Sequence, residues 1–417
     1  MHGFSFARGN AKKLLSLPFY ACGTLASLVT PRANDRWVFG SGSGIGEGAL
    51  ALFLRVRTEN PDLRLTWLAS DERDIAAATA IGIPAVPGSS ARGFWLTLRA
   101  RVVVVTHGFG DVNRYGTRGA FVVQLWHGVP LKLIQLDSPA TLRTSIPLVS
   151  RQVRSVLRRA YRRGYAGIRL MPAASELVAE RLRTAFGLPP DRIVATGDPR
   201  DDVLSRGTAA ERSAAARKVL FDKLALPNST SRVLLYAPTW RDGAPDPGSP
   251  TPRQWQRIDE YLESTDAVLV VRPHPHGIGD YHRGVLASGR VHILDSQSQS
   301  DVTPVLAAVD LLITDFSSIA YDYSLTGGPI LFLAPDEESY SRTRGLYEPY
   351  REFSGGREVR SWEALLHQLV RYDSDDDWAA EVRAHSDALC ARHFAFRDGR
   401  NTERVYAEIL RRLKAHQ

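Results

Sequence analysis

The chain has 417 residues, of which 44% are hydrophobic and 24% charged, with a formal net charge of +8. This length predicts two domains of ordinary size, and the composition excludes a disordered or fibrous chain. Two cysteines are too few for a disulfide framework, and the basic charge fits a nucleic acid, a membrane surface or a phosphorylated substrate without choosing among them.

The first predicted element is an uncharged apolar segment, Leu14–Val29, with basic residues on both sides. It is too short for a membrane span. Three interpretations fit it: a helix packed on the body, a segment lying in the membrane interface with its flanking cations on lipid headgroups, and, less well, a signal peptide. We expect residues 1–33 to form a membrane-associating segment.

Two series of short apolar runs follow, and each series alternates with helical patterns. The first lies within residues 34–215 and the second within 225–385, while residues 386–417 are predicted to form helices that could cross back. Such runs are typical of parallel strands covered by helices on both faces. The sequence therefore predicts two doubly wound α/β domains facing a cleft, with ligands bound beyond the carboxyl ends of the strands.

A glycine-rich loop, Gly40–Gly48, follows the first predicted strand. Its spacing does not match a dinucleotide-binding loop, and no acidic residue lies at a suitable distance after it. A tight turn between a strand and a helix is therefore the favoured interpretation.

A histidine, His127, follows the apolar run Ala120–Leu125 in the first series. Gly128 and Pro130 shape the turn behind it. An imidazole at the carboxyl end of a strand is well placed to act as a base in a cleft. Alone the signal is weak, because many such histidines only satisfy a turn.

Three strand ends of the second series carry side chains suited to an anion. Two prolines fix the backbone around His274, which favours a firmly aimed imidazole. Ser317 and Ser318 open a predicted helix whose first N–H groups form an anion site, with Asp322 one turn further on. The loop after the first strand could donate to a phosphate or a base, or could be shaped only by its proline. Its candidate residues are Thr239, Trp240 and Arg241.

Arginines recur at helical spacing near the middle of the chain, at Arg151, Arg154, Arg158 and Arg162. The pattern predicts a basic amphipathic helix. It is either a solvated charged face or a contact for anionic lipid or a lipid-linked diphosphate. Nucleic acid is not favoured as a partner, because aromatic residues are not interleaved as single-strand binding requires.

Six motifs in order resemble one known family. They are Trp126-His127-Gly128-x-Pro130, Thr196–Asp202, Tyr236–Arg241, Arg272-x-His274-Pro275, Thr314–Ser318 and Asp398–Arg400. Together they resemble the CDP-glycerol glycerophosphotransferase family, the primases and polymerases of teichoic acid and related capsule polymers. The resemblance implies a GT-B architecture, with two Rossmann-like domains, an active site between them and the nucleotide on the C-terminal domain. Three positions depart from the family pattern: Val129, Asp198 and Phe316.

The resemblance also implies a reaction at the cytoplasmic face of the membrane. A hydroxyl of a lipid-linked acceptor attacks the β-phosphorus of CDP-glycerol, and CMP leaves. It implies that His127 is the base on the acceptor side and that His274 is the second catalytic histidine. The residues implied to hold the diphosphate with His274 are Thr239, Arg241, Ser317 and Ser318, with help from Arg200.

Several alternatives stay open. Asp322 is either a ligand to the polar end of the donor or an orienter of His274. The donor could be CDP-ribitol, or the chain could be a GT-B sugar transferase of another family. A need for Mg²⁺ is also open, because no carboxylate cluster is evident and cations could take the place of the metal.

Overall fold

The computed structural model describes residues 17–139, 141, 151–226, 231–241, 244–274 and 277–415, with the backbone alone for residues 17 and 151–154. These residues form two compact units. The C-terminal unit contains Val129–Leu133 and Val203–Gly399. The N-terminal unit contains the chain up to Gly128, then Ile134–Asp202, and then the residues from Arg400 onwards.

The N-terminal unit is built on a seven-stranded sheet of order β3-β2-β1-β4-β5-β6-β7, in which every neighbouring pair is parallel. The strands are β1 (Ala33–Phe39), β2 (Arg64–Ala69), β3 (Ala85–Pro87), β4 (Ala100–Val105), β5 (Phe121–Gln124), β6 (Ile168–Ala173) and β7 (Ile193–Ala195). β4 shows why the sheet is buried on both faces. Val102 and Val104 pack in one hydrophobic cluster, and Val103 and Val105 pack in another on the opposite face.

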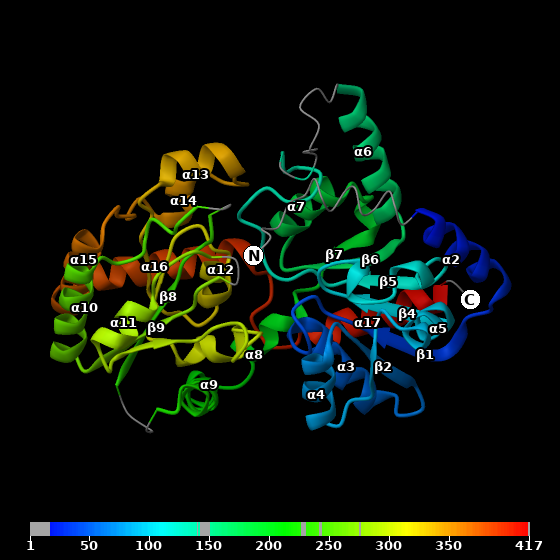
Figure 1. Cartoon of the computed structure of the whole chain (residues 1–417), viewed down its shortest axis with the longest axis horizontal. Coiled ribbons are helices and arrows are strands. Elements are labelled where there is room, and N and C mark those ends of the chain that lie inside the picture. Colours follow the sequence, from blue (N-terminus) through cyan, green and yellow to red (C-terminus); the bar gives the residue numbers. More distant parts are fainter. Residues whose placement is uncertain are drawn as a thin grey trace. The chain divides into compact units, whose positions relative to one another are not determined.

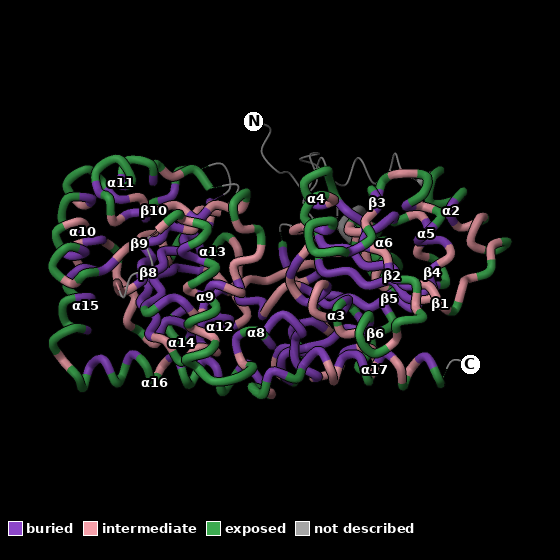
Figure 2. Tube along the Cα trace, turned by 90° about the horizontal axis from the view of Figure 1, so that it is seen from below, coloured by how far each residue is buried: buried purple, intermediate pink, exposed green. Residues whose placement is uncertain are grey.

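Helices cover both faces of this sheet (Figure 1). They are α2 (Leu17–Val29), α3 (Glu47–Glu59), α4 (Glu72–Ala80), α5 (Ala91–Arg99), α6 (Arg151–Tyr165), α7 (Glu176–Phe186) and α17 (Asn401–Ala415), with short 3₁₀ turns η1 (Phe109–Asp111), η2 (Arg114–Gly116), η3 (Pro190–Arg192) and η4 (Pro199–Asp201). The buried strands are visible in Figure 2 as purple tube. Local sequence sets the helix ends: Ser175 caps the start of α7, and Gly187 ends it with φ of +61°.

The first described helix, α2, packs on the body of the N-terminal unit. Phe19 and Tyr20 place their rings 5.7 Å and 5.0 Å from the ring of Tyr115 in η2. The opposite side of α2 leaves Leu25, Leu28 and other large apolar side chains exposed. In the part of the chain that the structure covers, no helix is both long enough and apolar enough to cross a membrane.

The C-terminal unit holds a second parallel sheet, of five strands in the order β10-β9-β8-β11-β12. The strands are β8 (Arg232–Ala237), β9 (Ala267–Val271), β10 (Val291–Ile293), β11 (Leu311–Thr314) and β12 (Ile330–Phe332). The other elements are α8 (Asp202–Ser205), α9 (Ala209–Leu224), α10 (Pro252–Ser264), α11 (His282–Ala287), η5 (Thr303–Ala308), α12 (Ile319–Ser324), α13 (Glu337–Arg344), α14 (Tyr350–Ser354), α15 (Trp362–Ser374) and α16 (Asp376–His393). The prediction of two doubly wound α/β domains is confirmed, and the architecture is GT-B.

The two units exchange short pieces of chain at positions that differ from the expected boundaries. Helix α9 spans the expected boundary at residue 215 but belongs wholly to the C-terminal unit, where it contacts η5. Helix α16 also stays in that unit, and the chain returns to the N-terminal unit at Arg400, within the segment 386–417 expected to cross back. The last helix, α17, then adds Val405 and Ile409 to the core of the N-terminal unit.

Candidate active site

The loop after β5 holds His127 in an unusual backbone setting. Trp126, the residue before it, has φ of +66°, and Gly128 after it has φ of +113°. A positive φ costs a bulky residue about 1–3 kcal/mol. Packing holds Trp126 there, because its buried ring lies edge-on to Phe186 at 5.2 Å and tilted against His127 at 4.0 Å. The loop therefore limits the directions that the imidazole of His127 can take.

A second imidazole lies against that of His127. His107 follows β4, the neighbour of β5 in the sheet, and its ring stacks on that of His127 with centroids 4.2 Å apart and planes 9° apart. A Cβ atom on Gly42 would lie 2.7 Å from Cγ of His107, so contact with this ring requires glycine there. His107 is not among the residues selected from the sequence, although it follows an apolar strand as His127 does.

The half-buried carboxylate of Asp111 fixes the loop that carries His107. Oδ2 of Asp111 accepts hydrogen bonds from the backbone amides of Thr106, His107 and Gly108 at 2.9, 2.7 and 3.2 Å. Burial raises the pKa of Asp111, and the amide of His107 and its ring charge oppose this shift. These three contacts set the path of the chain at the end of β4.

The surroundings of His127 favour its neutral form. The residue is half-buried, and its Nδ1 makes no hydrogen bond. Burial lowers the pKa of His127 well below its ordinary value of 6.5, and the charges of His107 and Arg200 lower it further. Arg200 is itself buried, in η4 of the same unit. A neutral imidazole is the form that can accept a proton.

Pro130 and the residues around it belong to the C-terminal unit. The segment Val129–Leu133 pairs there with residues 345–347: the amide of Leu133 donates to the carbonyl of Gly345, and that of Tyr347 donates to the carbonyl of Leu131. The predicted turn after His127 is therefore the point at which the chain passes from one unit to the other.

In the C-terminal unit, His274 lies in a short column of flat groups. Its ring stacks on that of Trp240 with centroids 5.5 Å apart and planes 17° apart. The guanidinium of Arg344, at the end of α13, lies 5.2 Å from the centre of the Trp240 ring. His274 and Trp240 are both half-buried. This column brings together a cation, an indole and an imidazole, groups that suit a nucleotide and its phosphates.

The guanidinium of Arg241 is bonded to carboxylates of its own unit. Its guanidinium is buried and bonded to two carboxylates: Nε donates to Asp336 at 2.7 Å, and Nη2 donates to Asp315 at 3.0 Å and to Asp336 at 2.7 Å. The backbone amide of Thr239 donates to the same Asp315 at 2.8 Å. Arg241 thus braces the loop that carries Thr239 and Trp240, and its expected role in holding a diphosphate stays a prediction.

Two serines precede the short helix α12. The hydroxyl of Ser317 accepts a hydrogen bond from the amide of Ile319 at 3.4 Å, whereas Ser318 makes no side-chain capping bond. Both serines are half-buried, and Asp322 is buried one turn further on. The two hydroxyls and Asp322 thus lie on one short stretch after β11.

Helix α6 carries the arginine pattern and projects away from the strands of its unit (Figure 1). Arg158 and Arg162 are exposed. The side chains of Arg151 and Arg154 lie outside the described residues. The predicted basic helix is therefore present as α6.

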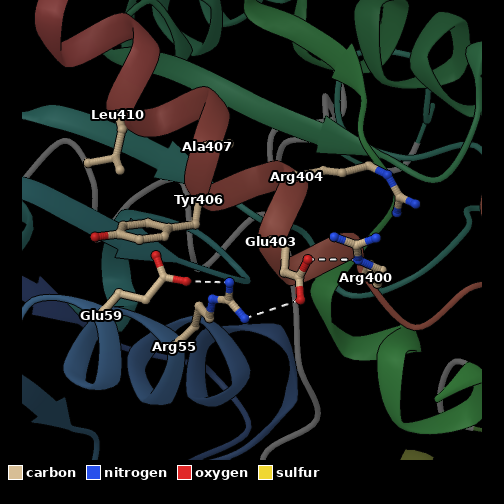
Figure 3. A pocket seen from close by; sticks show the side chains of 8 residues that line it. All are labelled: Arg55, Glu59, Arg400, Glu403, Arg404, Tyr406, Ala407 and Leu410. Atoms are coloured by element: carbon tan, nitrogen blue, oxygen red, sulfur yellow. Dashed lines mark hydrogen bonds and ion pairs between the residues drawn. The ribbon is translucent and has the colours of Figure 1, made fainter. Parts of the chain in front are cut away.

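A hollow of about 480 Å³ lies in the N-terminal unit; Arg400 of the sixth motif lines it, and none of the predicted site residues does. Helices α3 and α17 line it, and two of its three arginines pair with glutamates: Arg55 with Glu59 and Glu403, and Arg400 with Glu403 (Figure 3). The third, Arg404, donates to Asn401 at 2.9 Å. Because most of this positive charge is already paired with carboxylates, the hollow is a poor site for a diphosphate. Among the residues whose placement is described, no three His, Cys, Asp or Glu side chains gather as a metal site would require.

The family described as CDP-glycerol:poly(glycerophosphate) glycerophosphotransferase matches residues 25–411. The chain belongs to this family. The resemblance seen in the six motifs is therefore confirmed, and the strand-end residues described above are those of a CDP-glycerol glycerophosphotransferase family member.

Relatives in this family are named for two different polyol phosphates, ribitol phosphate and glycerol phosphate. The chain is 29% identical over 294 residues to the teichoic acid ribitol-phosphate polymerase TarK of Staphylococcus aureus, a match that covers 70% of this chain and 52% of that protein. It is 23% identical over 359 residues to the teichoic acid glycerol-phosphate transferase of the same organism, covering 85% and 87%. The chain spans about half the length of the polymerase relatives TarK and TarL.

Solved structures agree with the fold. The wall teichoic acid polymerase TagF superposes with a TM-score of 0.74 at 21% identity, covering 99% of this chain and 98% of that one. A UDP-N-acetylglucosamine 2-epimerase superposes with a TM-score of 0.53 at 14% identity, covering 93% and 97%. Both likenesses show that this chain shares the fold of these two proteins.

Proposed function

We propose that the chain transfers a polyol phosphate from a CDP-activated polyol to a hydroxyl group of a lipid-linked acceptor, with release of CMP, in the synthesis of teichoic acid or a capsule-type polymer. CDP-glycerol is the expected donor, and CDP-ribitol is the alternative because the family relatives include ribitol-phosphate polymerases. The observation that carries the proposal is the half-buried imidazole of His127 at a strand end, stacked on His107, in a chain of this family; burial lowers its pKa, which favours the neutral form of a base.

In this reaction the acceptor oxygen attacks the β-phosphorus of the donor. A bond forms between that oxygen and phosphorus, the bond from phosphorus to the bridging oxygen breaks, and CMP leaves with the bridging oxygen. The proton of the acceptor hydroxyl passes to His127, whose imidazole is the base. Charge spread over the phosphoryl oxygens requires cations and hydrogen-bond donors nearby.

The C-terminal unit supplies the donor site in this proposal. Trp240 and His274 offer flat, half-buried surfaces, and Arg344 adds a cation to the same column. The hydroxyls of Ser317 and Ser318 can donate to phosphate oxygens. Arg241 is left out of this set because two carboxylates already bind it.

The proposal places the chain on the cytoplasmic face of the cell membrane. Two elements of the N-terminal unit support this: α2 exposes large apolar side chains, and α6 exposes arginines. Apolar groups that enter the interface and cations that meet anionic headgroups are the two signals that give stable attachment to a membrane.

The function is tested by a donor screen. The purified chain is incubated with a synthetic lipid acceptor and either CDP-glycerol, CDP-ribitol or a UDP-sugar, with and without Mg²⁺, and products are measured by mass. We expect the acceptor to gain one glycerol phosphate, or one ribitol phosphate, with stoichiometric CMP. Transfer from a UDP-sugar with release of UDP, and none from a CDP-polyol, would instead assign a sugar transferase.

A further inference from the structure

His107 and His127 have matching positions in the sheet and stacked rings. The two residues end neighbouring strands, β4 and β5, and their rings stack with centroids 4.2 Å apart and planes 9° apart. Stacked imidazoles at this distance restrict each other's rotation. After burial, the charge of His107 is the next largest cause that lowers the pKa of His127, because two like charges would lie face to face.

A chain of hydrogen bonds holds His107 from its other end. Nδ1 of His107 lies 2.8 Å from Oγ1 of Thr106, which donates to Oγ of Ser41 at 3.0 Å. Ser41 in turn donates to Oε2 of Glu47 at 3.4 Å. The same hydroxyl of Thr106 lies 3.5 Å from Oδ2 of Asp111, so it links the ring of His107 both to Ser41 and to the carboxylate that fixes its loop.

The backbone supports the same arrangement. Glu47 has φ of +52°, a strained conformation at the first residue of α3. The glycine-rich loop before it meets His107 at Gly42, where a side chain would collide with the ring. The glycine-rich loop Gly40–Gly48 thus packs against the imidazole of His107.

The charged groups around the pair come from three elements, η4 with its N-cap residue, η1 and α3. Arg200 of η4 adds a positive charge that acts on His127 in the same direction as His107 does. Asp111 of η1 is bound by three backbone amides. Glu47 ends the hydrogen-bond chain, and Asp198 accepts the amide of Arg200 at 3.1 Å. Asp111 and Asp198 are therefore both engaged with backbone amides.

We propose that His107 is a positioning residue for the transfer reaction: its ring orients the imidazole of His127 and keeps it unprotonated until the acceptor hydroxyl delivers its proton. The inference rests on the proposed function, in which His127 is the base. His107 need not touch the substrate for this role, since it acts through the ring on which it stacks.

The test uses two substitutions and a direct titration. His107→Phe keeps a flat ring and removes the charge, while His107→Gln removes both. The full-length wild type and variants carry ¹³C-labelled histidine rings, and the His127 signal is assigned by its loss in His127→Asn. His282→Phe, which changes an exposed histidine on α11, is the control.

We expect the titration midpoint of His127 to rise by about half a pH unit or more in both His107 variants, because a like charge is removed. The acidic limb of kcat/KM should move to higher pH by the same amount, and kcat at high pH should fall in His107→Gln but not in His107→Phe. The control His282→Phe should change neither the titration midpoint of His127 nor the acidic limb of kcat/KM.

An unchanged His127 midpoint in both His107 variants would overturn the inference, whether or not the chain is active. The proposed function fails separately. If the His127 midpoint rises as expected while the wild type transfers nothing from any CDP-polyol, the coupling of the two rings stands and the reaction assigned to them is wrong.

Discussion

Among single residues, Arg241 shows how a buried charge finds its role. Its side chain lies between Asp315 and Asp336, and its Nη1 also donates to the carbonyl of Thr239 at 2.5 Å. Burial alone would lower the pKa of Arg241, but hydrogen bonds to Asp336 and the charge of Asp315 raise it overall. A permanently charged group in this position ties the loops after β8, β11 and β12 together.

Arg241→Gln should therefore act on stability. Removing the cation leaves the buried Asp315 and the half-buried Asp336 without the positive charge that pairs with them, which costs about 3–5 kcal/mol. We expect a clear fall in the melting temperature by circular dichroism, while Arg342→Gln, an exposed arginine on α13, should melt as the wild type does. A variant that melts normally but no longer binds CDP-glycerol would return Arg241 to the role of a diphosphate ligand.

Among the elements, α2 has two different sides. One packs on η2 through Phe19 and Tyr20, and the other exposes Leu28 and Val29, which are 70% and 81% exposed. The packed-helix and interfacial interpretations of this segment are thus compatible, because each uses its own side of the helix.

Replacing Leu28 and Val29 by serine should weaken binding to vesicles that contain anionic lipid. Each apolar side chain that enters lipid contributes roughly 1.5–3 kcal/mol when fully buried, so we expect at least a tenfold loss of affinity in co-sedimentation. The control replaces Leu286 and Val370, which are exposed on α11 and α15, by serine. Full retention of binding by the α2 variant would contradict this role for α2.

Elements of the fold could be predicted from local sequence more completely than the site. An apolar run such as Val102–Val105 is unambiguous, since a strand buried on both faces needs apolar residues at every position. The partnership of His107 with His127 could not be read in this way, because it depends on β4 lying beside β5. For the same reason the sequence could not show that the guanidinium of Arg241 binds the carboxylate of Asp336, which lies 95 residues further along the chain.

In the whole molecule, the chain leaves each unit and returns to it. Residues 129–133 pair inside the C-terminal unit directly after His127, and α17 completes the core of the N-terminal unit. Such crossings join segments far apart in sequence, so local patterns place them only roughly. The expected opposition of His127 and His274 over one diphosphate stays a prediction.

In the proposed reaction the two units have different roles. His127 of the N-terminal unit accepts the proton, and the C-terminal unit holds the donor. The most direct test measures CDP-glycerol affinity by calorimetry and transfer rate for His127→Asn and for the double variant Ser317→Ala, Ser318→Ala. We expect His127→Asn to lose about 10²–10⁴-fold in kcat with an unchanged Kd for CDP-glycerol, and the double serine variant to raise that Kd. A His127→Asn variant that turns over at the wild-type rate would contradict the account.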